Sequence, residues 1–279
     1  MNPLLTAIAA IMSAVGIFLA AQHQTFIRVD AGGPELRMLI AGRGKPTVVF
    51  EAGAGASLDH WIRIQPRVSQ FAQTVSYDRA GIGLSDAGPV PRDGAHVVAE
   101  LHAALKNAHL SPPYILVGHS LGGPFIRLFA ATYPREVAGL VLVDPTQEDL
   151  LAWAKEHVPD EDHKRSKHEP RLNDEVDCAP QTFAELKEKT LPPGLPITLI
   201  SGVGPREVPS FITESMRRDV EEDRVTLYPA KLRFHRGWVA KHPGARLVVT
   251  QKSGHGIPYE EPELVVKAVR DLVTQVAGQ

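Results

Sequence analysis

Six short apolar runs alternate with helical stretches along most of the chain, and this alternation constrains the fold more than any other feature. Short runs bounded by turn residues indicate buried strands, and helices between them indicate parallel pairing with right-handed crossovers. An earlier pair of runs, joined by a glycine and proline turn, predicts a hairpin at an antiparallel edge. The expected fold class is α/β. The predicted strands are 25–30, 35–41, 47–50, 74–77, 114–117, 140–143, 197–201 and 246–250.

Length, charge and cysteine content limit the domain organisation and the classes of partner that this chain can have. A chain of 279 residues suits one large α/β domain with an insertion. A formal net charge of -2 gives no general basic field for nucleic acid, so we expect no nucleic-acid partner. The single cysteine, Cys178, excludes an intrachain disulfide and a cysteine-based zinc cluster. Cys178 is expected to be a structurally minor thiol.

Residues 3–21 are uncharged and almost wholly apolar, with about the length that spans a bilayer as a helix. A basic stretch before them is missing, while Leu19, Ala20 and Ala21 offer a mediocre cleavage site for a signal peptide. A membrane anchor and a cleaved signal peptide both stay open, and a buried helix of the domain is a third interpretation. We therefore divide the chain into an apolar leader, 1–22, and a domain, 23–279, that is membrane-anchored or exported to the periplasm or the extracellular space.

The alternation of strands and helices stops over about 146–194, where charged residues crowd into 157–169. We predict a small inserted helical lid, because loops beyond about 15 residues are uncommon without a function. A long solvated surface loop is the alternative. His157, His163 and His168 fit no zinc-ligand spacing, so we expect no metal and no organic cofactor.

A G-x-S-x-G motif centred on Ser120 follows the strand 114–117 and precedes a helical run, 124–133. When this motif lies between a strand and a helix, it holds a nucleophilic serine on a strained turn. Small residues at Gly118 and Gly122 let the strand and the helix approach each other. Ser120 is therefore the predicted nucleophile, and the alternative is a plain glycine-rich turn.

An acyl-transfer site also needs N–H donors for the oxyanion of its tetrahedral intermediate. The backbone N–H of Leu121, directly after the nucleophile, is the first candidate. The second is Ala54, in the glycine-rich segment that follows the strand 47–50. The alternative for that segment is a simple turn.

His255 follows the last predicted strand and precedes a terminal helix, 262–276. Loops at the carboxyl ends of parallel strands are where sites form, so His255 is the predicted general base. Asp144 ends the strand 140–143 and is the predicted acid that orients His255. Its rival is Glu207, the first carboxylate after the next strand, and a structural turn role for Asp144 is the alternative.

These blocks resemble the α/β-hydrolase fold family, in its serine-nucleophile, esterase-like branch with a cap after the sixth strand. Residues 118–123, the D-R-A-G-I-G-L-S block at 78–85 and the histidine block at 254–262 carry the resemblance, which covers about 25–276. It implies a mostly parallel eight-stranded sheet flanked by helices, with the acid after the sixth or the seventh strand. Relatives commonly show His-Gly where this chain has Ala52 and Gly53. We expect Asp78 and Arg79 to stabilise a turn.

The predicted function is a serine hydrolase that transfers an acyl group from a small or medium ester-like substrate to Ser120 and then hydrolyses it. A serine at this position disfavours the dehalogenase and epoxide-hydrolase chemistries of the family, which use a carboxylate. Apolar residues of the lid, Leu150, Leu151, Trp153 and Val158, hint at an apolar acyl group. Three alternatives stay open: another chemistry of the fold, such as aminopeptidase, carbon–carbon hydrolase or lyase; a non-catalytic ligand-binding homologue; and a membrane-tethered interaction protein, suggested by residues 3–21.

Overall fold

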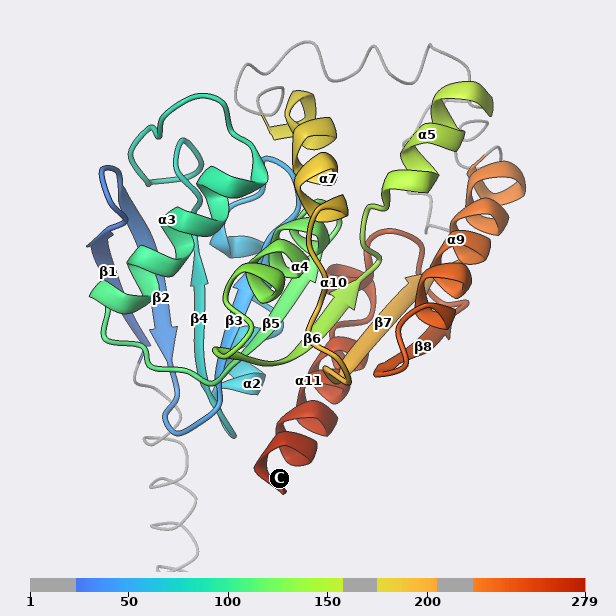
Figure 1. Ribbon diagram of the computed structural model, residues 1–279. Helices are drawn as coiled ribbons and strands as arrows, with labels where there is room; N and C mark the ends of the chain where they lie inside the picture. The colour runs from blue at the N-terminus through green and yellow to red at the C-terminus, as the bar shows by residue number, and fades with distance from the viewer. Residues whose placement is uncertain (1–23, 158–174, 205–222, 279) are drawn as a thin grey trace, which may run out of the picture.

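The computed structural model describes residues 24–157, 175–204 and 223–278 (Figure 1). An eight-stranded sheet runs through the domain in the order β1-β2-β4-β3-β5-β6-β7-β8. The leader, the middle of the predicted lid and Glu207 lie outside the described residues. The strands are β1 (Gln24–Asp30), β2 (Glu35–Ala41), β3 (Thr47–Glu51), β4 (Gln73–Tyr77), β5 (Tyr114–His119), β6 (Val137–Val143), β7 (Ile197–Gly202) and β8 (Ala245–Thr250).

The pairing of the strands confirms the predicted mixed sheet. β1 and β2 form the expected antiparallel hairpin, β2 also pairs antiparallel with β4, and the neighbours from β4 through β8 are parallel. Every predicted strand is present, with ends shifted by at most three residues. Because six parallel strands lie side by side, their carboxyl ends meet at one edge, where loops can converge on a site.

Helices cover both faces of the sheet (Figure 1). The face that carries α3, α4, α7 and α9 is opposite the face that carries α2 and α11. The longer helices are α3 (Gly94–Asn107), α4 (Gly122–Thr132), α5 (Glu148–His157), α7 (Ala179–Lys187), α9 (Tyr228–Ala240) and α11 (Pro262–Ala277). The short ones are η1 (Leu58–Trp61), α2 (Gln65–Val68), η3 (Asp223–Leu227) and α10 (Ile257–Glu260).

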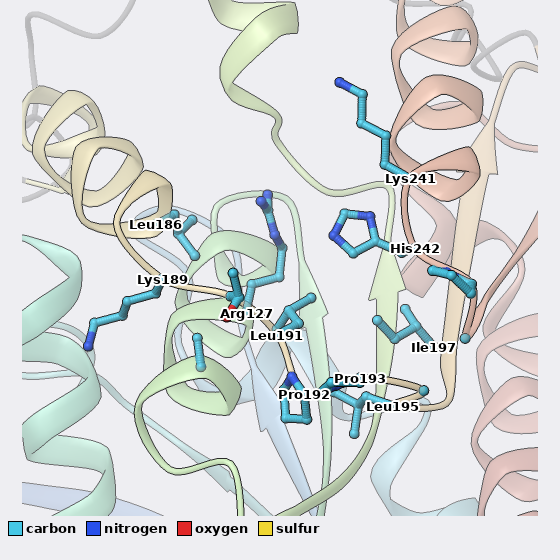
Figure 2. Close-up of a pocket in the computed structure, with 15 residues that line it drawn as sticks. Arg127, Leu186, Lys189, Leu191, Pro192, Pro193, Leu195, Ile197, Lys241 and His242 are labelled. Carbon is cyan, nitrogen blue, oxygen red and sulfur yellow. The ribbon is translucent and has the colours of Figure 1, made fainter.

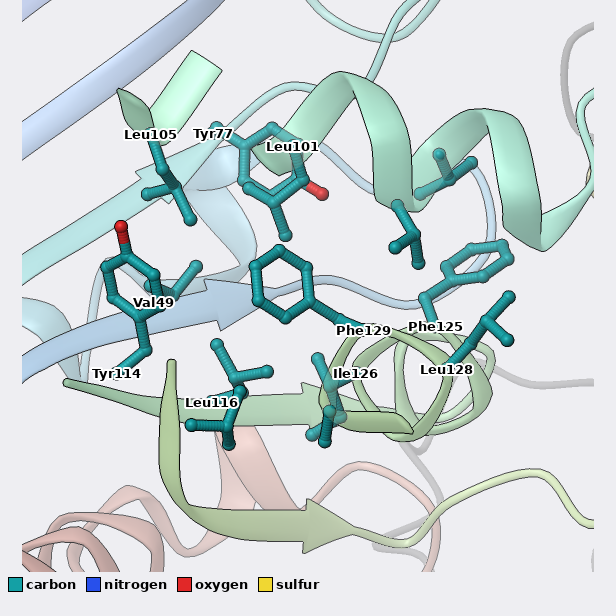
Figure 3. Packing of buried hydrophobic residues seen from close by; sticks show 14 of the residues in the cluster. Val49, Tyr77, Leu101, Leu105, Tyr114, Leu116, Phe125, Ile126, Leu128 and Phe129 are labelled. Atoms are coloured by element: carbon teal, nitrogen blue, oxygen red, sulfur yellow. The ribbon is translucent and has the colours of Figure 1, made fainter. Parts of the chain in front are cut away.

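The core is split in two by the sheet, because successive side chains of a strand point to opposite faces. On β3, Val49 belongs to the cluster under α3 and α4, whereas Val48 and Phe50 belong to the cluster under α11. Figure 3 shows the first cluster, in which Phe129 of α4 and Leu101 of α3 pack over Leu116 and other side chains of the sheet. Burial of both faces explains why these strands are continuous apolar runs.

The range predicted as a lid contains two described helices. α5 lies beside α9 above the carboxyl ends of the strands (Figure 1). α7 packs against α3 and α4, and its Phe183 and Leu186 join the first core cluster. α7 is thus part of the body of the domain.

Within the described part of the chain, no helix is both long and apolar enough to cross a bilayer. The apolar segment 3–21 lies outside that part, so the anchor and signal-peptide interpretations stay predictions.

Candidate active site

Ser120 sits on a tight turn between β5 and α4 with a backbone φ of +52°, a conformation that side chains other than glycine rarely adopt. A Cβ on Gly118 would lie 2.5 Å from the carbonyl oxygen of Gly122, and one on Gly122 would lie 2.5 Å from the carbonyl oxygen of Glu51. Glycine is therefore required on both sides of the turn. The expected close approach of strand and helix is present, and it places the serine hydroxyl at the carboxyl edge of the sheet.

Three predicted residues meet at this edge. The Ser120 Oγ lies 3.0 Å from His255 Nε2, and His255 Nδ1 lies 2.7 Å from Asp144 Oδ2. The Asp144 side chain is fully buried, whereas 55% of the His255 side chain is exposed. In the tautomer that donates from Nδ1 to the carboxylate, Nε2 is free to accept the serine proton. The chain of hydrogen bonds thus runs from an accessible hydroxyl to a buried charge.

Asp144 is held from several sides. It follows β6 with a φ of +42°, its N–H donates to the carbonyl of Ile200 at 2.7 Å, and its Oδ1 accepts the N–H of Gly202 at 3.0 Å. Its Oδ2 also accepts a hydrogen bond from Lys231 Nζ at 2.7 Å. Burial alone would raise the pKa of Asp144, but the charge of Lys231 and the bond to His255 hold it well below its usual range. Asp144 is therefore ionised at neutral pH.

Two buried histidines, His119 and His60, pack behind the exposed His255. The His119 ring packs on His255 with a centroid distance of 4.6 Å, its Nε2 donates to the His255 carbonyl at 2.9 Å, and its other face stacks on His60 at 4.7 Å. His119 therefore supports the predicted base through its ring and through a hydrogen bond to the backbone of His255. Burial lowers the pKa of His60 to about 4 and that of His119 well below its ordinary value. Both rings are uncharged at neutral pH.

The loop that carries Ala54 passes directly over the nucleophile. A Cβ on Gly53 would lie 3.3 Å from both Ser120 Cβ and His119 Nδ1, a tight distance that shows how closely the loop approaches the elbow. Leu121 is buried at the start of α4. Both proposed oxyanion donors, Leu121 and Ala54, therefore belong to segments that border Ser120.

A buried arginine holds this loop from behind. Arg79 donates to the carbonyls of Ala52 and Gly53 at 2.9 and 2.7 Å, and to carboxylate oxygens of Glu51 and Glu175 at 2.6 Å each. The sequence prediction gave Arg79 only a role in a turn, and the structure adds this wider role. Arg79 fixes the backbone on which Ala54 sits.

Asp78, the neighbour of Arg79, ties two loops together. Its carboxylate accepts the N–H of Leu58 at 2.7 Å and that of Leu84 at 3.0 Å. This is the structural role expected from the sequence, extended to a second loop.

Four residues of the site were missed from the sequence: Lys231, Glu175, Glu51 and Thr146. Thr146 Oγ1 lies 3.5 Å from Ser120 Oγ, at the limit of a hydrogen bond. Lys231 and His235 are four positions apart, so a helix places both on one face. This spacing is a signal in the sequence that the two polar side chains act together. The spacing does not show which loop this face of the helix packs against.

The hollow drawn in Figure 2, about 290 Å³ in volume, is a separate feature. It lies between α4, the segment before β7 and the turn from α9 into β8, and Ile197 at the start of β7 lines it. The other end of β7 is Gly202, which contacts Asp144. The hollow is thus at the opposite edge of the sheet. Arg127 on its wall is already paired with Glu148 at 3.1 Å, so we assign this hollow no role in the chemistry.

No group of three or more histidine, cysteine or carboxylate side chains is arranged for a metal ion in the described ranges. His157, one of the three histidines considered from the sequence, instead hydrogen-bonds the Trp153 carbonyl at 2.8 Å and stacks on the indole ring of Trp153. His163 and His168 lie outside the described residues.

An eight-stranded, mostly parallel sheet with a serine elbow, an acid after the sixth strand and a histidine after the last strand defines an α/β hydrolase. The chain has the α/β-hydrolase fold. The family model described as alpha/beta hydrolase fold matches residues 46–173.

Relatives support this assignment. The uncharacterized protein YqjL of Bacillus subtilis is 29% identical over 231 residues, which are 83% of this chain and 85% of YqjL. The enol-lactonase of Burkholderia xenovorans superposes with a TM-score of 0.60 at 18% identity, covering 90% of this chain and 100% of that one. An esterase of Thermogutta terrifontis gives a TM-score of 0.58 at 20% identity, covering 90% and 99%. At these identities the two solved structures are similar to this chain in fold.

Proposed function

We propose that this α/β hydrolase is a serine hydrolase that acts on small or medium ester-like substrates, with Ser120 as nucleophile, His255 as general base and Asp144 as the acid. One observation supports it above the others: Ser120, His255 and Asp144 form a continuous hydrogen-bonded chain with distances of 3.0 and 2.7 Å. The similarity in fold to an esterase and an enol-lactonase is consistent with ester-like substrates.

The proposed reaction has two halves. Ser120 Oγ attacks the acyl carbon while its proton passes to His255 Nε2, and the N–H groups of Leu121 and Ala54 stabilise the oxyanion. The tetrahedral intermediate collapses when the imidazolium returns that proton to the leaving alcohol. Water then attacks the acyl-enzyme with His255 as base, which releases the acid and restores the hydroxyl of Ser120. Asp144 stays ionised and stabilises the imidazolium in both halves.

The described lid residues were considered above as a sign of an apolar acyl group. Leu150 is buried, and Leu151 packs against the first core cluster. The Trp153 ring faces Phe234 of α9, with a centroid distance of 6.5 Å. Leu150, Leu151 and Trp153 therefore serve packing between α5 and the body of the domain, and Val158 lies outside the described residues.

Labelling of the full chain with a fluorophosphonate probe tests the proposal, because an activated serine attacks phosphorus and expels fluoride. We expect wild type to be labelled, Ser120→Ala and His255→Ala to stay unlabelled, and Ser111→Ala, an exposed serine outside the site, to behave as wild type. Labelled protein is then assayed on acyl esters of graded chain length. Absence of labelling in folded wild type would overturn the proposal in favour of a binding role. Labelling without hydrolysis of any ester would instead favour aminopeptidase, carbon–carbon hydrolase or lyase chemistry.

A further inference from the structure

A lysine shares one oxygen of the proposed acid with the proposed base. Lys231 Nζ and His255 Nδ1 each lie 2.7 Å from Asp144 Oδ2. The Lys231 side chain is 6% exposed and that of Asp144 is fully buried, so solvent screens their ion pair little. The mechanism proposed above does not use this cation.

We infer that Lys231 is a positioning residue that holds Asp144 ionised and offsets the attraction of Asp144 for a proton on His255. This inference rests on the proposed serine-hydrolase function.

The charges of the group explain the effect. With Lys231 present, the neutral imidazole completes a group of zero net charge, and protonating His255 raises that charge to +1. Without the lysine, the same protonation would cancel the charge of a buried carboxylate and would be favoured. Asp144 alone thus favours the imidazolium, and Lys231 counteracts that preference. A neutral residue at position 231 should make His255 harder to deprotonate.

α9 is fixed to the acid loop by a second contact, so the position of Lys231 is well defined. His235, one helical turn after Lys231, bonds the carbonyl of Pro145 at 3.1 Å through Nε2 and the hydroxyl of Ser201 at 2.9 Å through Nδ1. Burial lowers the pKa of His235, although Asp144 opposes this. The Tyr228 ring lies 4.6 Å from Lys231 Nζ. These contacts orient the ammonium without neutralising it.

The other groups around His255 do not replace this charge. His119 and His60 stack in line behind the imidazole, and burial lowers the pKa of both, so they stay uncharged from about pH 5 upward. The carboxylate of Glu260 accepts the N–H of Gly254 at 3.3 Å, beside His255 in the chain. Among the described residues, Lys231 is the cationic side chain that contacts Asp144.

The test is the rate of fluorophosphonate labelling of the full chain from pH 4.5 to 9. Lys231→Met and Lys231→Gln remove the charge, Lys231→Arg keeps it, and Lys241→Met removes an exposed lysine at the end of the same helix. For the neutral variants we expect the midpoint of the acid limb to rise by about one pH unit, which slows labelling by up to about tenfold below the wild-type midpoint and leaves a similar rate near pH 9. Lys231→Arg and Lys241→Met should keep the wild-type midpoint.

Circular dichroism and thermal melting establish which variants fold, and one folded neutral variant is enough. A folded Lys231→Met or Lys231→Gln with the wild-type midpoint and only a lower plateau would overturn the inference, because a merely structural lysine gives that result. Lys231→Arg with the raised midpoint would overturn it too. The proposed function fails separately, if wild type is not labelled at any pH.

Discussion

The carboxylate of Glu175 accepts a hydrogen bond from the backbone N–H of Gly55 at 3.1 Å, across 120 positions of the chain. The same carboxylate receives two bonds from Arg79, at 2.6 and 2.7 Å, and its side chain is 2% exposed. Arg79 in turn holds the carbonyls of Ala52 and Gly53. A residue just before α7 therefore fixes the loop that carries the proposed oxyanion donor Ala54.

Replacing Glu175 with glutamine should loosen this loop. Removing one charge of a buried pair leaves the other without full compensation, so we expect the free energy of unfolding to fall by about 3 kcal/mol and fluorophosphonate labelling to slow. Glu188→Gln, an exposed neighbour on the same segment, is the control and should change neither. Urea denaturation and labelling rates measure the two effects. Unchanged labelling in a destabilised Glu175→Gln would show that the loop does not depend on this contact.

Asp144→Asn should lower turnover by about 10³-fold or more, because an amide does not hold the His255 tautomer that accepts the serine proton. Glu207→Gln, which removes the rival acid considered from the sequence, should leave turnover near wild type. Steady-state kinetics on the best ester measure both variants. The reverse pattern would move the acid to Glu207.

Two glycine substitutions should change stability in opposite directions. A Cβ on Gly122 meets the backbone carbonyl oxygens of Glu51 and Ala52 at 2.5 and 2.7 Å, so Gly122→Ala should cost about 1–3 kcal/mol. Gly237, within α9, has no heavy atom within 4 Å of its Cβ position, so Gly237→Ala should stabilise the domain by up to about 1 kcal/mol. Thermal melting of both variants, compared with wild type, measures these changes. A stabilised Gly122→Ala would contradict the close approach of strand and helix at the elbow.

Acid should destabilise the fold through His60. Its pKa falls from 6.5 to about 4 on burial, so between these values the unfolded chain binds the proton and the folded one does not. The stability that this residue contributes is complete above about pH 6.5 and is lost as the pH falls toward 4. From pH 7 to pH 5 the loss is on the order of 2 kcal/mol. His60→Phe, which keeps a ring in the stack, should lose less stability over that interval in chemical denaturation, and an equal loss would exclude His60 as the cause.

The apolar leader makes a prediction about location. If residues 3–21 act as an anchor, the full chain should sediment with membranes and resist extraction by high salt, while a chain starting at Gln24 should not. A cleaved signal peptide would instead give a shortened protein outside the cytoplasm. Cell fractionation with mass measurement of the mature protein separates these outcomes. A full-length protein that remains free in the cytoplasm would refute both.

The strands were predictable because both faces of the sheet are buried, which makes each strand an apolar run bounded by turns. Ser120 and His255 were predictable because a local motif and a position after the last strand identify them. Lys231 and Glu175 were not. Each acts through a contact with a residue more than 85 positions away in the chain. The local sequence does not show which distant residue a side chain will contact. α9 was missed for a related reason, since its one buried face carries Lys231 and His235 among its core residues.

Ser120 and Asp144 are placed by neighbouring strands: His119 pairs with Val143 in the sheet, and the Ser120 N–H donates to the Val143 carbonyl at 3.2 Å. His255 stands on a loop beyond the sheet, with more than half of its side chain exposed. The proposed nucleophile and acid are thus fixed to each other by the sheet itself, whereas the proposed base depends on its loop and on contacts with His119 and Asp144. If the loop loosens before the sheet melts, fluorophosphonate labelling of Ser120 should be lost on moderate heating and should return on cooling.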